Sequence, residues 1–249
     1  MSTQSLEIDE IKSQYGHLVL PKIVAFDLDK TIHDIITIYE NIVNQTRIYM
    51  GAQPWQDSEF REFHKDGFVS NEMSFKKMFP GKEDMALTYY YDRFHASTVT
   101  RDKLIPGSSF MLHRFKKLYN LQIIGVTNSE QHMAKKAMRD LEIFGLFDSI
   151  TGPRGNRKLK PETELLIIGL NKIDKKPGKE VWFLGDSPTD TKCAREANCT
   201  SIRFFYEQEK PIDPYADAYS DCHFKYEKIV GTLLGFYTQK PFLNAAANI

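Results

Sequence analysis

The chain has 249 residues, a length that fits one large domain or a core domain carrying a smaller insertion. Lysine plus arginine and aspartate plus glutamate both total 33, so the formal net charge is zero and bulk charge gives no reason to expect nucleic acid or an anionic membrane as a partner. No apolar run approaches the roughly 20 residues of a transmembrane helix, and the polar N-terminal segment is unlike a secretory signal. With three cysteines that lack metal-binding spacing, we expect a cytoplasmic globular protein with reduced thiols.

Four short apolar segments predict buried strands of a parallel sheet, because each ends in polar residues and helical stretches separate them. They cover residues 23–29, 121–129, 181–187 and 200–205. Apolar residues recur at helical spacing beside them and predict helices over residues 108–119, 130–144, 161–169 and 190–197. The pattern indicates an α/β fold with a Rossmann-like parallel sheet.

The segment between the first two predicted strands is far longer than one crossover helix needs. Ile35, Tyr39 and Ile42 recur at helical spacing, and turn-forming residues separate further helical stretches. These stretches cover residues 58–65, 72–78 and 83–96. The sequence thus predicts an α/β core made of residues 1–34 and 105–249, and a small helical domain of residues 35–104 inserted into it. The C-terminal segment PFLNAAANI is expected to be a loosely held extension.

Polar side chains close three of the predicted strands. Asp27 and Asp29 end the first, residues 127–129 (Thr-Asn-Ser) end the second, and Asp186 ends the third. Ligands bind at the carboxyl ends of the strands in such sheets, so these side chains are expected to meet. In an extended backbone Asp27 and Asp29 would point to the same side, which crowds two like charges unless the chain turns or a cation stands between them.

The two carboxylates suggest phosphoryl chemistry. A carboxylate attacks phosphorus readily when a divalent cation neutralises the repulsion, and such a cation takes oxygen ligands. We therefore take Asp27 as a candidate nucleophile and Asp29 as the acid that protonates the leaving oxygen and later the base that activates water. Asp186 is the expected partner in holding the cation. Asp190, at the start of the next helix, is expected to support it.

Two further motifs supply candidates for binding a phosphoryl group. Thr127 or Ser129 can hydrogen-bond a phosphoryl oxygen, and Lys160, beside Pro161, can balance the negative charge of nucleophile and phosphate. Taken singly, each motif also fits a plain turn or helix start. Their order along the chain, each beside a predicted strand, favours the functional interpretation.

The chain resembles the haloacid dehalogenase superfamily, in its phosphoglycolate phosphatase-like branch with a helical cap. The stretch DLDKT (27–31) is similar to the first motif of that family, and VTNS (126–129) is similar to the second. Lys160 of KLKPE (158–162) is similar to the third motif, and GDSPTD (185–190) to the fourth. The resemblance implies Mg²⁺ held by the Asp27 side chain, the backbone carbonyl of Asp29 and Asp186. It also implies a phosphate-binding site made of Thr127, Asn128 and Lys160. Asp190 and Thr31 are expected to support the site.

The chain departs from the family pattern at two places. Lys30 stands where glycine is most common, and Asn198-Cys199 replaces the usual Ala-Gly pair. The retained Asp29 argues against the dehalogenase and phosphonate-cleaving branches, because those lack an acid at this position.

Basic and aromatic residues of the inserted segment are candidates for recognising the substrate, although most such side chains only solvate helix surfaces. Three consecutive tyrosines on a helix cannot all face one way, so at least one is expected to pack in the interior. The candidates are His64, Lys65, Lys76, Lys77, Arg93 and residues 89–91.

We therefore expect a magnesium-dependent phosphatase that hydrolyses a small phosphorylated metabolite through an aspartyl-phosphate intermediate, with no nucleic-acid or membrane partner. Two alternatives stay open at this point. One is a sugar phosphomutase of the same fold, and the other is a non-enzymatic binding protein that keeps the fold.

Overall fold

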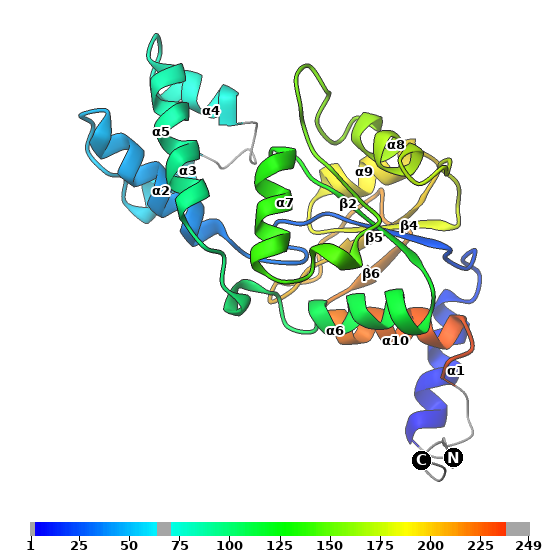
Figure 1. Cartoon of the computed structure of the whole chain (residues 1–249). Helices are drawn as coiled ribbons and strands as arrows, with labels where there is room; N and C mark the ends of the chain where they lie inside the picture. Colours follow the sequence, from blue (N-terminus) through cyan, green and yellow to red (C-terminus); the bar gives the residue numbers. More distant parts are fainter. Residues whose placement is uncertain (1–2, 64–70, 238–249) are drawn as a thin grey trace, which may run out of the picture.

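A central parallel sheet of six strands organises the protein (Figure 1). The computed structural model describes residues 3–63 and 71–237. In spatial order the sheet runs β3 (Ser149–Thr151), β2 (Gln122–Val126), β1 (Ile23–Phe26), β4 (Val181–Gly185), β5 (Thr200–Phe204) and β6 (Ala218–Ser220). Every neighbouring pair is parallel. The first strand of the chain therefore lies in the middle of the sheet, between β2 and β4.

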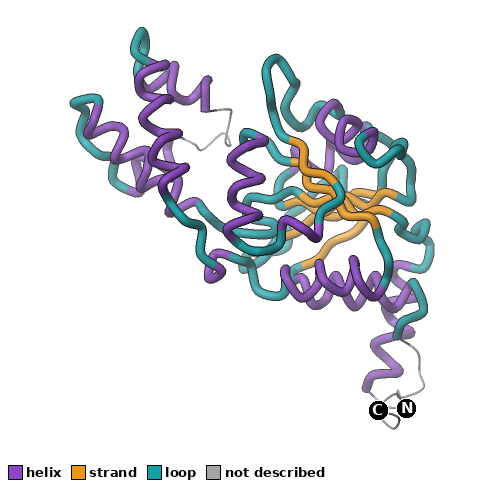
Figure 2. The backbone as a smooth tube through the Cα atoms, in the orientation of Figure 1, coloured by secondary structure: helices purple, strands orange, loops and turns teal. Residues whose placement is uncertain are grey.

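Helices cover both faces of this sheet, so the central strands are buried on both sides (Figure 2). Side chains alternate along β1: Val24 and Phe26 pack on one face, Ile23 and Ala25 on the other. On the first face lie α1 (Thr3–Tyr15), α6 (Ser108–His113), its π-helical continuation η2 (Arg114–Leu118), α7 (Gln131–Asp140) and α10 (His223–Leu233). On the second lie α8 (Glu164–Asn171) and α9 (Pro188–Glu196).

Four helices stand beside the sheet and belong to the chain segment between β1 and β2 (Figure 1). They are α2 (Ile36–Tyr49), α3 (Asp57–Phe63), α4 (Asn71–Met78) and α5 (Glu83–Ala96). Their aromatic side chains form a separate apolar cluster, centred on Phe75, Tyr90 and Phe94, which Met133 of α7 joins from the sheet side. We call this segment the helical insertion.

The two chain connections to the helical insertion run side by side. The Ile105 N–H donates to the Ile32 carbonyl at 3.0 Å, and the Asp34 N–H donates to the Lys103 carbonyl at 2.8 Å. His33 and Leu104 form an antiparallel bridge between the same two segments. Residues 32–34 and 103–105 therefore form a paired neck between the sheet and the helical insertion.

The four predicted strands and the α/β class are confirmed, but each strand is shorter than predicted at its carboxyl end. The polar residues of the motifs lie just beyond these strand ends, although Asp27 and Thr127 still donate their N–H groups to the neighbouring strands β4 and β3. The predicted helices 72–78 and 83–96 coincide with α4 and α5 within one residue, whereas the helix predicted over 130–144 ends at Asp140. The last two residues of the helix predicted over 58–65 lie outside the described residues, as does the C-terminal segment 241–249.

Several elements were not predicted. The strands β3 and β6 have only three residues each, and α1 and α10 lie before and after the recognised motifs. All three cysteines are free thiols, as expected. Within residues 3–63 and 71–237, no helix is both long enough and apolar enough to cross a membrane.

Candidate active site

A tight turn directly after β1 separates the two aspartates of the first motif. The Asp27 N–H donates to the Leu184 carbonyl of β4 at 2.9 Å, which holds this residue at the end of the sheet. The next residues curl back, because the N–H groups of residues 31–33 all point to the Leu28 carbonyl. The Asp27 side chain is consequently 9% exposed, and that of Asp29 is 37% exposed. The turn resolves the charge crowding that an extended chain would impose.

Lys30 occupies the strained position of this turn, with a φ of 58°. A non-glycine residue in the left-handed region costs roughly 1–2 kcal/mol. This geometry gives a physical reason for glycine at this position in the family motif. Here the turn is kept in spite of the lysine, which adds a positive charge near Asp186.

The Asp29 carboxylate is held by the second motif. The Ser129 hydroxyl donates to Asp29 Oδ2 at 2.7 Å, and the Thr127 hydroxyl donates to the same oxygen at 3.2 Å. On the other oxygen, His33 Nε2 lies 3.8 Å from Oδ1. The structure therefore brings the first two motifs together at the carboxyl ends of β1 and β2 and fixes the direction of Asp29.

Lys160 joins the other aspartates. Its buried ammonium lies 2.5 Å from Asp27 Oδ1 and 2.7 Å from Asp190 Oδ1, and donates to the Val126 carbonyl at 2.9 Å. Asn128 brackets the backbone of the same residue, since its amide donates to the Lys160 carbonyl and accepts from the Lys160 N–H. Asn128, which the sequence predicts as a phosphate ligand, therefore positions Lys160 in the structure.

The fourth motif holds its acids through the start of α9. Pro188 is the first residue of α9, and Asp190 Oδ2 accepts hydrogen bonds from the Ser187 N–H at 3.0 Å and the Ser187 hydroxyl at 2.6 Å. Gly185 makes room for this side chain, because a Cβ built there would lie 2.3 Å from the Asp190 Cβ. Asp190 is therefore fixed on the helix side of the site.

Three carboxylates converge closely enough to share a cation. One oxygen from each of Asp27, Asp186 and Asp190 lies within 4.8 Å of the other two. Burial, together with the neighbouring acids, raises the pKa of Asp27 well above its usual range despite the opposing charge of Lys160. Burial also raises the pKa of Asp186 to about 6, with Asp190 adding to the effect. Crowded acidic oxygens of this kind are the donor set that a hard divalent cation takes, so these residues fit such an ion.

Lys160 stays charged in this setting. Burial opposes its charge, but Asp190 and Asp27 together raise the pKa of the ammonium above its ordinary value. The cation at Lys160 and the three acids therefore form one buried electrostatic unit.

One supporting contact could not be found from the sequence. Nε2 of His223, on α10, donates to the Thr31 carbonyl at 2.7 Å, and its ring stacks on Phe204 with centroids 4.5 Å apart. Burial lowers the pKa of this imidazole to about 4, so it is neutral near pH 7. His223 lies 192 residues from Thr31 in the chain and belongs to no motif, which left no signal for it. Thr31 itself is fully buried.

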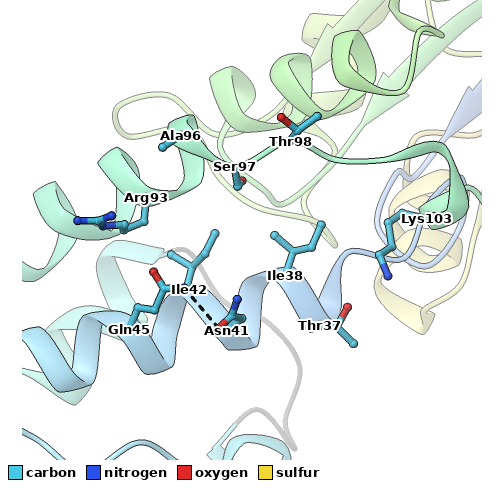
Figure 3. Close-up of a pocket in the computed structure, with 10 residues that line it drawn as sticks. All are labelled: Thr37, Ile38, Asn41, Ile42, Gln45, Arg93, Ala96, Ser97, Thr98 and Lys103. Carbon is cyan, nitrogen blue, oxygen red and sulfur yellow. Dashed lines mark hydrogen bonds between the residues drawn. The ribbon is translucent and has the colours of Figure 1, made fainter.

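The basic candidates of the helical insertion have partners within the insertion. The Lys77 ammonium lies over the Phe63 ring at 4.7 Å, and the Arg93 guanidinium over the Tyr89 ring at 4.9 Å. Arg93 also lines a cavity of about 480 Å³ between α2 and the end of α5, with Lys103 at its other end (Figure 3). Lys76 is exposed on α4, and His64 and Lys65 lie outside the described residues.

The three tyrosines face different ways. Tyr90 is buried in the apolar cluster, and Tyr89 stacks on Tyr49 at 4.1 Å between centroids. The Tyr91 hydroxyl donates to Glu130 at the start of α7. The prediction that at least one tyrosine packs inside is confirmed.

Comparison with known proteins agrees with this geometry. The model of the family described as haloacid dehalogenase-like hydrolase matches residues 24–204. A phosphoglycolate phosphatase of Pseudomonas fluorescens is 24% identical over 78% of this chain and 73% of its own length, and one of Chromobacterium violaceum is 26% identical over 79% and 87%.

Solved structures show the same fold. A predicted phosphoglycolate phosphatase from Haemophilus somnus superposes with a TM-score of 0.70 at 18% identity, covering 84% of this chain and 97% of its own. CbbY from Rhodobacter sphaeroides, solved in complex with phosphate, gives a TM-score of 0.69 at 16% identity, covering 82% and 95%. The family match spans all four motifs that meet at the carboxyl edge of the sheet, and the chain belongs to the haloacid dehalogenase-like hydrolases.

Proposed function

We propose that this protein is a magnesium-dependent phosphatase that hydrolyses small phosphate monoesters through an aspartyl-phosphate intermediate. The observation that carries the proposal is the separation of two carboxylates by environment. Asp27 is buried against Lys160 within a group of acids, whereas Asp29 is partly exposed and held by hydroxyl groups. Two acids with different environments can serve as nucleophile and as proton donor.

The ion fits the acids at the end of β1 and β4. Asp27 and Asp186 would hold Mg²⁺ through their side chains, and Asp29 through its backbone carbonyl. When bound, Mg²⁺ would screen the charge of nucleophile and phosphate and orient the phosphoryl oxygens. Asp190 is committed to Lys160 and to the start of α9, which supports a role beside the ion rather than directly on it.

The residues of the chain carry the remaining steps. Asp27 attacks phosphorus and forms the aspartyl phosphate, while Asp29 gives its proton to the leaving oxygen. Asp29 then takes a proton from the water that hydrolyses the intermediate. Lys160 balances the charge that collects on Asp27 and on the phosphoryl group. Thr127 and the backbone near Asn128 line the place where phosphoryl oxygens would lie.

Several relatives support a small substrate. The Pseudomonas and Chromobacterium relatives carry the name phosphoglycolate phosphatase, and the Rhodobacter structure was solved with phosphate. We also propose that residues 35–104 act as a domain that covers the site and selects the leaving group, since they are inserted directly after the nucleophile strand.

A panel of phosphate esters with Mg²⁺ tests the proposal. We expect release of inorganic phosphate, loss of activity in excess chelator and suppression by Ca²⁺, whose looser coordination misplaces the nucleophile. Rapid quench should trap a phosphoenzyme that Asp27→Asn cannot form. Isomerisation of a sugar phosphate without phosphate release would point to a phosphomutase. Full activity in chelator, or no turnover of any ester, would overturn the proposal.

A further inference from the structure

His33 carries a buried imidazole in the paired neck that the proposed mechanism does not use. Its side chain is 2% exposed, and within residues 3–63 and 71–237 neither Nδ1 nor Nε2 makes a hydrogen bond. Burial lowers the pKa of the ring against the opposing effect of Asp29 and Asp34, so the imidazole is neutral near pH 7. A buried polar group without a hydrogen bond costs stability and is rare in folded proteins. A role in the reaction would explain a side chain that is unfavourable for folding at this position.

The backbone of His33 is held from two sides. Its N–H donates to the Leu28 carbonyl at 3.2 Å, and its carbonyl accepts from the Lys30 N–H at 2.6 Å. On the other side, the antiparallel bridge with Leu104 joins it to the returning segment of the neck. The turn that contains Asp29 therefore also sets the place of the imidazole.

The imidazole faces one oxygen of the proposed acid and base. Nε2 of His33 lies 3.8 Å from Asp29 Oδ1, whereas Oδ2 of the same carboxylate accepts from the hydroxyls of Ser129 and Thr127. Among the described residues Oδ1 has no hydrogen-bond donor, so the carboxylate is held through one oxygen. A separation of 3.8 Å is too long for a hydrogen bond. Hydrogen bonds between catalytic groups are often long without substrate, however, and shorten when the substrate binds.

We propose that His33 is a positioning residue whose Nε2–H donates to Oδ1 of Asp29 in the substrate complex and so fixes the second oxygen of the acid. This inference rests on the proposed phosphatase function and adds a residue to its machinery. Oδ1 has two lone-pair positions, so one accepts from His33 and the other carries the proton that passes to the leaving oxygen. His33 keeps its own proton throughout. With both oxygens held, the Asp29 carboxyl group cannot rotate away from the leaving oxygen.

His33→Leu removes the donor and keeps an apolar side chain in the buried space. The full-length protein with Mg²⁺ is assayed on 2-hydroxyethyl phosphate, an alkyl ester, and on p-nitrophenyl phosphate, an aryl ester. The ratio of kcat/KM between the alkyl and the aryl ester should fall on the order of tenfold, because only the alkyl leaving oxygen needs a well-placed proton donor. The unfolding temperature should stay the same or rise, because leucine replaces a polar group without a hydrogen bond. A purely structural role for His33 predicts a lower unfolding temperature and an unchanged ratio.

A conservative variant and a neck control accompany this substitution. His33→Gln places an amide N–H near the position of Nε2, so it should restore the alkyl-to-aryl ratio to within about threefold of the parent value. The control Leu104→Ala disturbs the neck from the other side of the same bridge. It should lower the unfolding temperature through lost packing and leave the ratio within about twofold.

The variant Asp29→Asn tests whether His33 acts through Asp29. Without the acid there is no proton to position, so adding His33→Leu to Asp29→Asn should change kcat/KM for the alkyl ester by less than about twofold. The same substitution in the parent protein should lower it about tenfold.

The outcomes separate two failures. Hydrolysis of both esters with an alkyl-to-aryl ratio unchanged in His33→Leu would overturn the role of His33 and leave the phosphatase function intact. An equal effect of His33→Leu in the parent protein and in Asp29→Asn would do the same. Absence of turnover for every ester, including the aryl phosphate, would overturn both.

Discussion

The ammonium nitrogen of Lys160 lies 2.5 Å from Oδ1 of Asp27, the side chain that we propose as the nucleophile. Both side chains are almost fully buried, and Asp190 completes the group at 2.7 Å from the same nitrogen. A buried carboxylate is costly unless a cation or hydrogen bonds compensate it. Lys160 thus compensates the charge of Asp27 in the free protein, and we expect it to compensate the charge of the phosphorylated Asp27 as well.

Lys160→Met should remove this compensation. Losing one partner of a buried ion pair lowers the free energy of unfolding by about 3–5 kcal/mol, and loss of a stabilising charge lowers kcat by about 10²–10³-fold. Thermal unfolding and steady-state hydrolysis of p-nitrophenyl phosphate measure the two effects. A kcat within threefold of the parent value would show that the charge of Lys160 is not needed.

Asp29→Asn should separate two kinds of leaving group. An alkyl phosphate needs protonation of its leaving oxygen, so turnover should fall on the order of 10²–10⁴-fold. An aryl phosphate leaves without much help, so its first step should suffer less and the phosphoenzyme should accumulate. Rapid-quench trapping checks this. Equal losses for both ester types without trapped intermediate would show that Asp29 is not the acid.

Gly185→Ala should disturb the fourth motif. Its added Cβ would lie 2.3 Å from the Asp190 Cβ, so either β4 or the start of α9 must move. Overpacking of this kind costs about 1–3 kcal/mol and displaces Asp190 from Lys160. The unfolding temperature and kcat should both fall. Gly145→Ala is the matched control, since its Cβ would meet nothing within 4 Å. If Gly185→Ala and Gly145→Ala have the same unfolding temperature and kcat, the close approach of residue 185 to Asp190 is contradicted.

His223 should make stability depend on pH. Its pKa is about 4 in the folded protein and about 6.5 when unfolded, so between these values the unfolded chain binds the extra proton. The stability present above pH 6.5 is therefore lost as the pH falls toward 4, by up to about 3 kcal/mol. Urea unfolding at several pH values measures the free energy of unfolding, which should depend less steeply on pH in His223→Gln than in the parent protein. The control His113→Gln changes an exposed imidazole. If the free energy of unfolding depends on pH equally in the parent protein and in His223→Gln, His223 is not the source of that dependence.

The residues at the carboxyl edge of the sheet could be predicted from the sequence, but the short outer strands and the residues that contact the site from distant parts of the chain could not. Asp27, Thr127 and Asp186 each follow an apolar strand, and the parallel sheet brings such positions together whatever the rest of the chain does. The short strands β3 and β6 carry too few residues for a period to show. His223 and Glu130 act through contacts with residues distant in the chain, which no local pattern records.

Asn128 and Lys30 illustrate what geometry adds to a motif. The sequence placed Asn128 near phosphate, and only the fold shows its amide bracketing the Lys160 backbone. The sequence marked Lys30 as a departure from glycine, and the φ of 58° gives the physical reason for that glycine. In both cases the residue type was visible and the backbone constraint was not.

The paired neck has a consequence for how this protein tolerates change. Its two segments are already joined by hydrogen bonds at Ile32, Asp34 and their partners, so the ends of the helical insertion are held together by the core. The chain entropy of closing such a loop grows slowly, by about 0.6 kcal/mol for each doubling of length. Lengthening, shortening or exchanging the insertion beyond the neck therefore changes little in the folding of the sheet. The strand β1 and the turn after it can keep their geometry while the segment that we propose to select the leaving group evolves almost independently.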